Sequence, residues 1–401
     1  MKFLRTIFVL TVFVFFIGSS GPMAKEKIEH VPKYQSMREH VSLVKNLPEQ
    51  MKRFEFDSGY HFEYPDAVRG IYVTGHSAGG EKFNQLVNLT EQTDLNSMVI
   101  DIKDDWGHLT YIPDDSSSYK KIGKPYIKNP MQMLKTLEEK QVYPIARIVV
   151  FKDTALAKEK PELSFRKGSE VWTNGRGESF VNPFLKEVWD YNVGIAIEAA
   201  KMGFQEIQFD YVRFPEGFET RDKSLKYSIG DYEKLDLDNT QKRVQAVTDF
   251  VAYAKEKLEP YGVRVSVDIF GYTATLPEAP GIGQNFSKIV EHIDVISSMI
   301  YPSHWTAYFG ISKPDLEPYK LVSEYAKVES NILSKVENPP ISRPWLQDFT
   351  ATWLGKGNYK KYGKAEVEAQ IKALNDQGIT EFLLWNAGNS YSENVDYTPN
   401  S

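Results

Sequence analysis

Eight short runs of apolar, β-branched and aromatic residues recur along the chain, and turn residues bound each of them. Several runs are almost continuously apolar, which is typical of strands that are buried on both faces. The pattern therefore predicts eight strands in a sheet that other elements cover. The runs are VRGIYVT (68–74), SMVIDIK (97–103), VYPIARIVV (142–150), FQEIQFDYV (204–212), VRVSVDIFG (263–271), DVISSMIY (294–301), RPWLQDF (343–349) and TEFLLWN (380–386).

Helix-like segments separate most of these runs. In residues 182–203, Asn182 is a plausible N-cap, Pro183 fits the first turn and Gly203 fits the end of a helix. The segments 239–262 and 364–378 also end in glycine, directly before the fifth and eighth runs. Alternating strands and helices of this number predict an α/β fold of the (β/α)8 TIM-barrel class.

The rest of the chain divides simply around this barrel. We expect a signal peptide or N-terminal anchor over 1–24, an extension packing on the barrel over 25–67, the catalytic barrel over 68–392 and a tail over 393–401. Long insertions follow the third, fourth and sixth strands, at the end where barrel enzymes keep their chemistry. They cover residues 151–181, 213–240 and 302–317.

The N-terminus predicts export. Lys2 and Arg5 precede a run from Ile7 to Ile17 that holds only apolar residues and threonine, and small residues follow. This run is too short for an ordinary membrane-spanning helix, which needs about 20 apolar residues, and matches a secretory signal. An uncleaved membrane anchor is the alternative. We expect a secreted or envelope-associated protein that contacts a membrane only through this segment, if it is not cleaved.

Composition narrows the function further. The absence of cysteine excludes disulfides, thiolate metal sites and a cysteine nucleophile. A formal net charge of −6 with scattered signs offers no basic face for nucleic acid. The aromatic content of 13% suits a sugar-binding cleft as well as a core. We expect a monomer without a cofactor.

Side chains alternate between faces along a strand, so each run can be tested for polar residues on one face. With Asp101 and Lys103 taken as inward, a matching choice collects polar residues near the C-terminal ends of seven strands. An unpaired buried polar group costs about 1–3 kcal/mol, which favours a ligand site at the barrel mouth. A self-satisfied plug of Asp101, Lys103, Arg147 and Asp210 is the alternative. The matching residues are Arg147, Gln208, Asp210, Ser266, Asp268, Ser297, Tyr301, Gln347 and Asn386.

Two carboxylates provide candidate chemistry. Asp210 ends the fourth strand and Asp268 lies near the end of the fifth. Neighbouring strands lie about 4.8 Å apart, so the two side chains can flank one bond. Glycoside hydrolysis needs such a pair, in which one acid protonates the leaving oxygen and the other attacks the sugar or activates water. We predict Asp210 as the ionised member and Asp268 as the acid, with Glu216 and Asp101 as competitors for the acid.

Further side chains could bind the substrate. Arg147, Lys103 and Arg213 would keep one carboxylate ionised. Rings near strand ends could stack on sugars, and the segment from Tyr301 to Trp305 is the strongest example because it combines rings with hydrogen-bonding groups. The predicted substrate-binding residues are Asp101, Lys103, Trp106, Arg147, Gln208, Arg213, Glu216, Tyr301, His304, Trp305, Gln347, Trp385 and Asn386.

Nine motifs in order resemble the bacterial glycoside-hydrolase-like family catalogued as domain of unknown function 4015. They span about residues 65–392 and read GIYVTG, VIDIKDDWG, ARIVVFKD, VNPFLKEVWDYN, EIQFDYVRFP, VSVDIFGY, DVISSMIYPSHW, RPWLQDF and LLWNAGNSY. The resemblance implies a TIM-barrel glycosidase-like domain in a secreted or surface-attached protein. It also implies that Asp210 is the strand-four acid that related barrel glycosidases use, whereas it supports Asp268 less firmly.

Other chemistries are possible but fit less well. The stretch Gly75 to Gly79 matches the G-x-S-x-G elbow of serine hydrolases, with Ser77 as nucleophile, but it follows the first strand and lacks a histidine after the last strand. Lys103 among aspartates would be too strongly charged for a Schiff base. The acids have no regular metal-ligand spacing, so we expect no metal. The predicted function is cleavage of an extracellular or cell-envelope polysaccharide, and the alternative is a non-catalytic carbohydrate-binding barrel.

Overall fold

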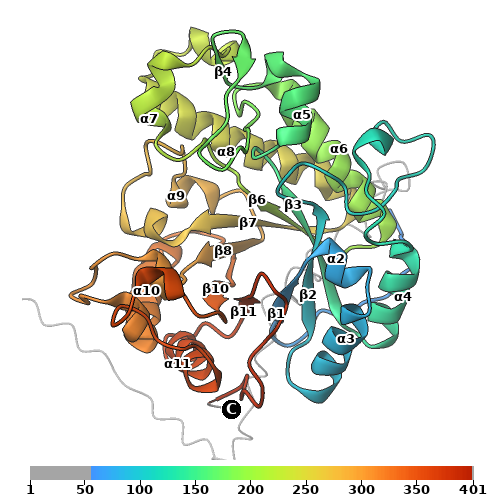
Figure 1. Cartoon of the computed structure of the whole chain (residues 1–401), viewed down its shortest axis with the longest axis vertical. Helices are drawn as coiled ribbons and strands as arrows, with labels where there is room; N and C mark the ends of the chain where they lie inside the picture. The colour runs from blue at the N-terminus through green and yellow to red at the C-terminus, as the bar shows by residue number, and fades with distance from the viewer. Residues whose placement is uncertain (1–55, 400–401) are drawn as a thin grey trace, which may run out of the picture. The chain divides into compact units, whose positions relative to one another are not determined.

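The computed structural model describes residues 56–399, which form a closed barrel of eight parallel strands (Figure 1). Strand order around the barrel is β1, β2, β3, β6, β7, β8, β10 and β11, and β11 pairs with β1. Closure between β8 and β10 rests on a single residue pair, Met299 with Trp345. The strands are β1 (Arg69–Val73), β2 (Ser97–Lys103), β3 (Tyr143–Val149), β6 (Glu206–Asp210), β7 (Arg264–Phe270), β8 (Val295–Met299), β10 (Trp345–Gln347) and β11 (Phe382–Trp385).

The (β/α)8 prediction is therefore confirmed, and each of these strands lies within a run that the sequence predicts. Three shorter strands lie outside the barrel wall or beside it. β4 (Arg166–Lys167) and β5 (Glu170–Val171) form an antiparallel hairpin in the insertion after β3. β9 (Ile341–Ser342) pairs with the lower part of β8 and leads into β10.

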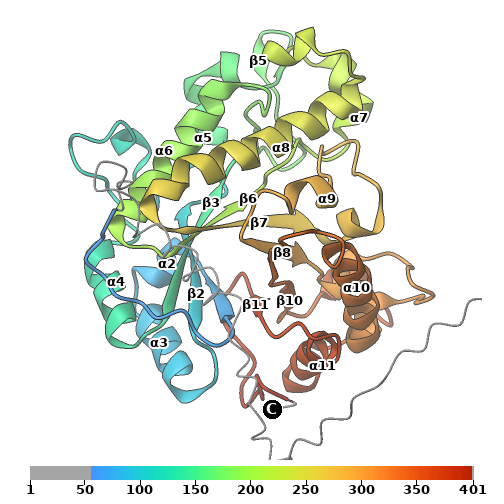
Figure 2. The ribbon, with the colours of Figure 1, turned by 180° about the vertical axis from the view of Figure 1, so that it is seen from behind.

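Helices surround the barrel, as Figures 1 and 2 show from opposite sides. The α-helices are α2 (Gly75–Ala78), α3 (Lys82–Gln92), α4 (Pro130–Glu139), α5 (Thr154–Glu159), α6 (Lys186–Met202), α7 (Phe218–Arg221), α8 (Asn239–Leu258), α9 (Phe286–Ile289), α10 (Pro318–Leu333) and α11 (Lys364–Asn375). The short 3₁₀ helices used below are η8 (Pro302–His304), η9 (Pro314–Leu316) and η10 (Thr352–Leu354). No helix within residues 56–399 has both the length and the apolar character needed to cross a membrane.

Local sequence explains where these helices begin and end. Asp238 caps α8 by accepting a hydrogen bond from the backbone of Gln241. Gly203 ends α6 with a φ of 122°, a conformation that glycine adopts easily. The predicted N-cap Asn182 is wrong, because α6 begins only at Lys186. The side chain of Asn182 instead accepts from the backbone N–H of Phe184 and donates to the carbonyl of Ser228.

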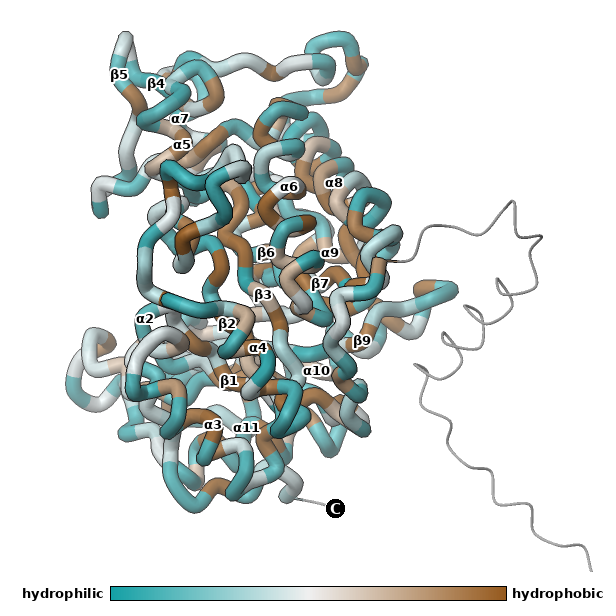
Figure 3. The backbone as a smooth tube through the Cα atoms, turned by 90° about the vertical axis from the view of Figure 1, so that its right-hand side faces the viewer, coloured by the Kyte–Doolittle hydropathy of each residue, from teal (hydrophilic) through white to brown (hydrophobic). Residues whose placement is uncertain are grey.

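Two apolar layers hold the barrel together. A large outer layer lies between the strands and the helices and includes Ile71, Ile148 and Leu384. A smaller inner layer fills the barrel and includes Val99, Ile145 and their neighbours Tyr72, Tyr143, Tyr301, Trp345 and Leu383. Figure 3 shows the corresponding hydrophobic stretches along the central strands. Aromatic rings therefore replace part of the aliphatic filling of the barrel interior.

The N-terminal end of the barrel is closed by a buried ion cluster. Arg343 is fully buried and donates to Glu206 at 2.7 Å and to Glu381 at 2.8 Å. Tyr64, in the segment that leads into β1, accepts a further hydrogen bond from Arg343 at 2.9 Å. Residues 56–67 thus pack on this end of the barrel, whereas the rest of the predicted extension, 25–55, and the predicted signal, 1–24, lie outside the described residues.

Candidate active site

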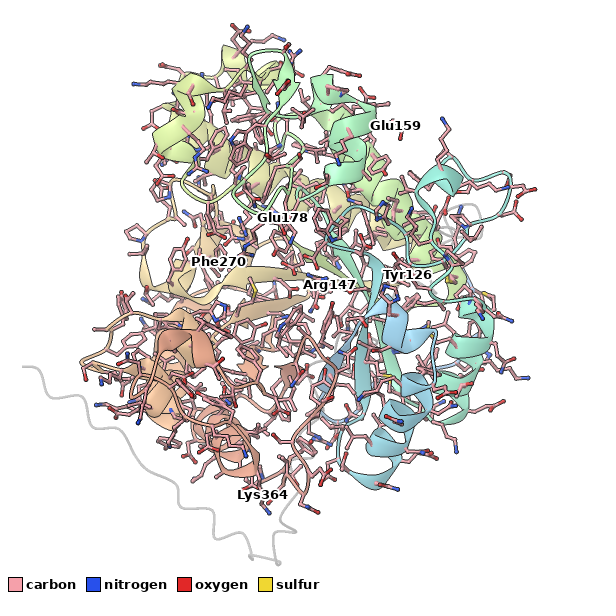
Figure 4. The ribbon with its side chains drawn as sticks, viewed as in Figure 1. Tyr126, Arg147, Glu159, Glu178, Phe270 and Lys364 are labelled. Atoms are coloured by element: carbon pink, nitrogen blue, oxygen red, sulfur yellow. The ribbon has the colours of Figure 1, made fainter. Side chains whose placement is uncertain are left out.

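Arg147, on β3, is the centre of the polar cluster at the C-terminal end of the barrel, and Figure 4 shows it within the ring of strands. Its side chain is 1% exposed. Nη1 donates to Asp101 at 2.7 Å, while Nε and Nη2 donate to one oxygen of Asp210 at 3.0 and 2.6 Å. Nη2 also lies 3.6 Å from Asp105. One guanidinium thus joins carboxylates from β2, β6 and the loop after β2.

Asp210 is held from two sides. Its Oδ2 accepts both Arg147 hydrogen bonds, and its Oδ1 accepts one from the backbone N–H of Tyr211 at 2.6 Å. Tyr211 has a φ of 53°, in the left-handed region that non-glycine residues rarely adopt. Such strain often marks functional segments. These contacts suit a carboxylate that carries its negative charge.

Asp268 lies beside Asp210 in the barrel. Gln208 pairs with Ser266 and Phe209 with Val267, so the parallel register brings Asp210 and Asp268 onto neighbouring strands at the same level. Asp268 is 1% exposed and accepts a hydrogen bond at Oδ1 from the indole N–H of Trp345 at 2.8 Å. Burial, reinforced by the charge of Asp210, raises the pKa of the Asp268 carboxyl well above its usual range.

Asp101, on β2, has both oxygens in use. Oδ1 accepts from Arg147, and Oδ2 accepts from the hydroxyl of Tyr72 at 2.5 Å. Burial raises the pKa of Asp101 to about 6, although Arg147 acts in the opposite direction. Because its hydrogen-bonding capacity is already committed, Asp101 is a poorer proton donor to a substrate than Asp268.

A second set of charges lies at the rim. Lys152 contacts Asp105 at 2.6 Å and Glu178 at 3.4 Å, and its ammonium lies 3.9 Å from the centre of the Tyr211 ring. Burial opposes ionisation of Asp105, but Arg147 and Lys152 outweigh it and lower the pKa of this carboxyl. The rim therefore keeps opposite charges paired beside the deeper acids.

Aromatic rings form one wall of the cluster. Tyr72 and Trp385 stack with ring centres 4.0 Å apart, and Arg147 lies 5.5 and 5.4 Å from their centres. Tyr301 follows at 6.4 Å from Trp385. Below them, the amide of Gln208 donates to Ser297 at 3.2 Å, and its buried carbonyl oxygen has no partner within residues 56–399. Apolar faces and polar groups thus lie side by side, as in carbohydrate sites.

The structure corrects the strand-face prediction for Lys103. A bulge between Asp101 and Lys103 places Lys103 opposite Ile148, so the side chain turns to the outer layer. There it pairs with Asp153 at 2.6 Å and donates to Asn192 of α6 at 2.9 Å. All of this is fully buried, and Lys103 therefore supports the fold rather than the mouth.

Three other predicted binding residues also have structural contacts. The prediction that Asn386 faces inward is wrong, because Leu384, on the same face of β11, packs in the outer layer and Trp385 faces inward. Asn386 instead donates to the carbonyls of Asp348 and Ser390. Trp305 packs against Tyr325 of α10. Gln347 is fully buried and braces the loops by accepting from Ser303 N–H and donating to Asp315.

The remaining candidates lie around the rim. Arg213 is buried between the rings of Tyr211 and Phe270, 4.7 and 4.6 Å from their centres, and pairs with Glu216. The Glu216 side chain is 71% exposed. Trp106 is exposed after β2, and His304 is exposed beside Tyr301, 5.3 Å between ring centres.

Ser77 has no catalytic partner in this part of the chain. It lies in α2, where its backbone N–H donates to Thr74, and no histidine within residues 56–399 accepts from its hydroxyl. His76 instead packs on Tyr126, 3.8 Å between ring centres. Within the same residues, no group of three or more His, Asp or Glu side chains is arranged to hold a metal ion.

Sequence reasoning missed several contributors to the cluster: Tyr72, Lys152 and Trp345. Trp345 had a signal, since it shares a strand face with Gln347, which is predicted to point inward, whereas no inward residue is predicted on the strand of Tyr72. Lys152 follows β3 in a loop, where strand alternation gives no direction. Two cavities of about 240 Å³ lie elsewhere, one beside Asn96 and one beside Gly79, so the candidate site rests on side-chain arrangement rather than on cavity size.

A match to a family model identifies the family of the chain. Residues 70–391 match the family of domain of unknown function 4015, described as "Putative glycosyl hydrolase domain". The chain belongs to this family. The resemblance seen in the sequence motifs is thereby confirmed over most of the barrel and its loops.

One solved structure has the same fold. The glycoside hydrolase domain of PgaB (BpsB) from Bordetella bronchiseptica is 15% identical, with a TM-score of 0.53, and the match covers 80% of this chain and 94% of that one. A hypothetical protein from Ruminiclostridium thermocellum is 32% identical over 49% of this chain and 96% of that one, with a TM-score of 0.42. No curated protein matches the chain. The protein is thus a glycoside-hydrolase-like barrel.

Proposed function

We propose that the protein hydrolyses glycosidic bonds of a polysaccharide outside the cell or in its envelope, with Asp210 and Asp268 as the catalytic pair. The observation that carries this proposal is the placement of the two carboxylates on adjacent strands in contrasting surroundings. Asp210 receives three hydrogen bonds from Arg147 and the Tyr211 backbone, whereas Asp268 is buried and receives one from Trp345. Pairs of acids in such contrasting surroundings are typical of acid and base partners.

In the proposed reaction, Asp268 is the general acid. Its raised pKa favours the protonated carboxyl, which gives this proton to the leaving glycosidic oxygen. Asp268 Oδ2 has no hydrogen bond within residues 56–399, which leaves this oxygen for the substrate. Asp210 then either attacks the sugar or takes a proton from the attacking water, and Arg147 stabilises its charge.

The test is a pair of isosteric substitutions. We expect Asp210→Asn and Asp268→Asn to reduce turnover on the active polysaccharide by at least about 10²-fold, the scale on which acid and base catalysis act. Asp376→Asn is the matched control, because Asp376 lies at the end of α11, outside the candidate site, and pairs with Lys372 and Tyr319. Unchanged turnover in both aspartate variants would show that the catalytic assignment is wrong.

A non-catalytic carbohydrate-binding barrel is the second candidate. The complete pairing of Asp101 and the double contact of Arg147 to Asp210 favour it, because such a cluster also stabilises a closed barrel end. Binding of a polysaccharide by the purified protein without any release of reducing ends would support this second candidate over hydrolysis.

We further propose that the protein is exported. The support is the basic start and the short apolar run at Ile7 to Ile17, which resemble a secretory signal. Fractionation of cells that produce the protein, with sequencing of its N-terminus, tests this point. Recovery of an unprocessed chain in the cytosol alone would refute it.

A further inference from the structure

Trp353 presents a large apolar ring to solvent at the barrel mouth. It lies in η10, in the loop after β10, and is 63% exposed. Its indole stacks on Phe349 with ring centres 5.9 Å apart and an interplanar angle of 23°. Single exposed apolar residues are common, so the exposure alone says little. The contacts of this ring with other aromatic residues are what indicate a function.

A continuous series of ring contacts leads from Trp353 to the candidate active site. Phe349 lies 5.9 Å from Tyr301, and Tyr301 lies 6.4 Å from Trp385, whose ring is beside the Arg147 guanidinium. His304 lies 6.3 Å from the Trp353 ring and 5.3 Å from Tyr301. The exposed indole is therefore the outer end of the same aromatic wall that borders the carboxylates.

The loop that carries Trp353 is fixed to its neighbours. Buried Asp315, in η9, accepts the backbone N–H of Lys360 at 3.0 Å and the side-chain amide of Gln347 at 3.0 Å. Tyr362 donates to the Asp315 carbonyl at 3.3 Å. These bonds join both sides of the loop to β10 and η9. A ligand that stacks on Trp353 would thus meet a surface that needs little further ordering.

We propose that Trp353, with Phe349 and His304 beside it, is a distal sugar-binding subsite for a unit of the same chain that reaches the carboxylates. The inference rests on the proposed function and deepens it. Phe349 and His304 separate Trp353 from Tyr301, so the subsite takes a different sugar unit from the one at Asp210. The substrate is then an extended polysaccharide, and the subsite binds the apolar face of a pyranose ring by stacking.

Binding measurements in an inactive background test the subsite. Asp210→Asn protein is run in native gels containing dextran, mannan, xylan, carboxymethyl cellulose, polygalacturonate or glycol chitosan. We expect at least one polymer to retard it, and Trp353→Ala in the same background to weaken that affinity by about tenfold, the size of a ring-stacking contribution. Tyr319→Ala is the matched control, since Tyr319 is an exposed ring on α10, 40% exposed, and should leave the affinity unchanged.

The outcomes separate this inference from the proposed function. Equal affinity of the Trp353→Ala and Tyr319→Ala proteins for the retarding polymer, or no retardation by any polymer, would overturn the subsite. A disaccharide of the same sugar should bind both proteins equally; an equal loss for disaccharide and polymer would also overturn it. Loss of a dimer on ultracentrifugation of Trp353→Ala would assign the ring to a protein contact instead. Retained turnover in Asp210→Asn alone would contradict the catalytic proposal and leave the subsite standing.

Discussion

Replacement of Arg147 by methionine tests the electrostatics of the site most directly. The side chain is buried and pairs with Asp101 and Asp210 at 2.7 and 2.6 Å, so its removal leaves two carboxylates in the barrel without their cation. Breaking a buried pair in this way costs about 3–5 kcal/mol. We expect Arg147→Met to lower the free energy of unfolding by this amount at pH 7.

The loss should shrink as the pH falls. Without Arg147, the two carboxylates bind protons in the folded protein at a pH where the unfolded chain has released them. Stability then decreases as pH rises from about 4 to 7, by about 1.4 kcal/mol per pH unit for each extra proton held by the folded state. The free energy of unfolding should therefore differ less from wild type at pH 5 than at pH 7.

Urea unfolding at both pH values, followed by tryptophan fluorescence and circular dichroism, measures this difference. Arg343→Met is the matched control, because Arg343 pairs with Glu206 and Glu381 at the opposite end of the barrel. It should destabilise the protein similarly, while Arg147→Met alone should also remove turnover in the fraction that remains folded. An equal loss of stability at pH 5 and pH 7 for Arg147→Met would refute the charge-pairing argument.

Three further outcomes follow from the same contacts. The pH profile of kcat/KM should fall on the alkaline side as Asp268 loses the proton that its raised pKa retains, and Asp101→Asn should remove an acidic inflection, because burial raises the pKa of Asp101 to about 6. A profile without an alkaline fall would contradict the first expectation, and an acidic inflection that persists in Asp101→Asn would contradict the second. Trp345→Phe removes the hydrogen bond that favours ionised Asp268, so the alkaline limb should move to higher pH, and a move to lower pH would be inconsistent with this role. Lys103→Met should destabilise the fold by about 3–5 kcal/mol, because it leaves Asp153 buried and unpaired, but KM measured on the folded fraction should not change; a large rise in KM would return Lys103 to the site.

The sequence predicted the barrel because its strands are buried on both faces and therefore read as apolar runs. All eight barrel strands lie within the predicted ranges, including β10, which has only three residues. The start of α6 was less predictable, because Asn182 has N-cap chemistry but uses it to bind Phe184 and Ser228. A polar side chain before a helix can form hydrogen bonds within the loop instead of capping the helix. A single sequence does not distinguish these two roles.

Strand alternation brought Arg147, Asp210 and Asp268 to one place but failed for Lys103 and Asn386. For Lys103 the cause is the bulge in β2, which reverses the side-chain direction within one residue. For Asn386 the cause is the choice of the inward face in β11. Leu383 and Leu384 are equally apolar, so the sequence does not show which of them points into the barrel. Alternation is thus reliable where a strand is regular and carries polar residues on one face, and unreliable at its ends.

The two ends of the barrel show why buried charge alone does not identify a site. Arg343 and Arg147 each join two buried carboxylates and lie near a tyrosine. At the Arg343 end, however, Tyr64 from the segment before β1 accepts a hydrogen bond from the guanidinium and covers the cluster. At the other end, Tyr211 is strained beside Asp210, and an aromatic wall leads out to solvent. A cluster that only stabilised the barrel would need neither of these two features. Their coincidence at the C-terminal end of the strands is the physical reason to assign chemistry to the Arg147 cluster and structural support to the Arg343 cluster.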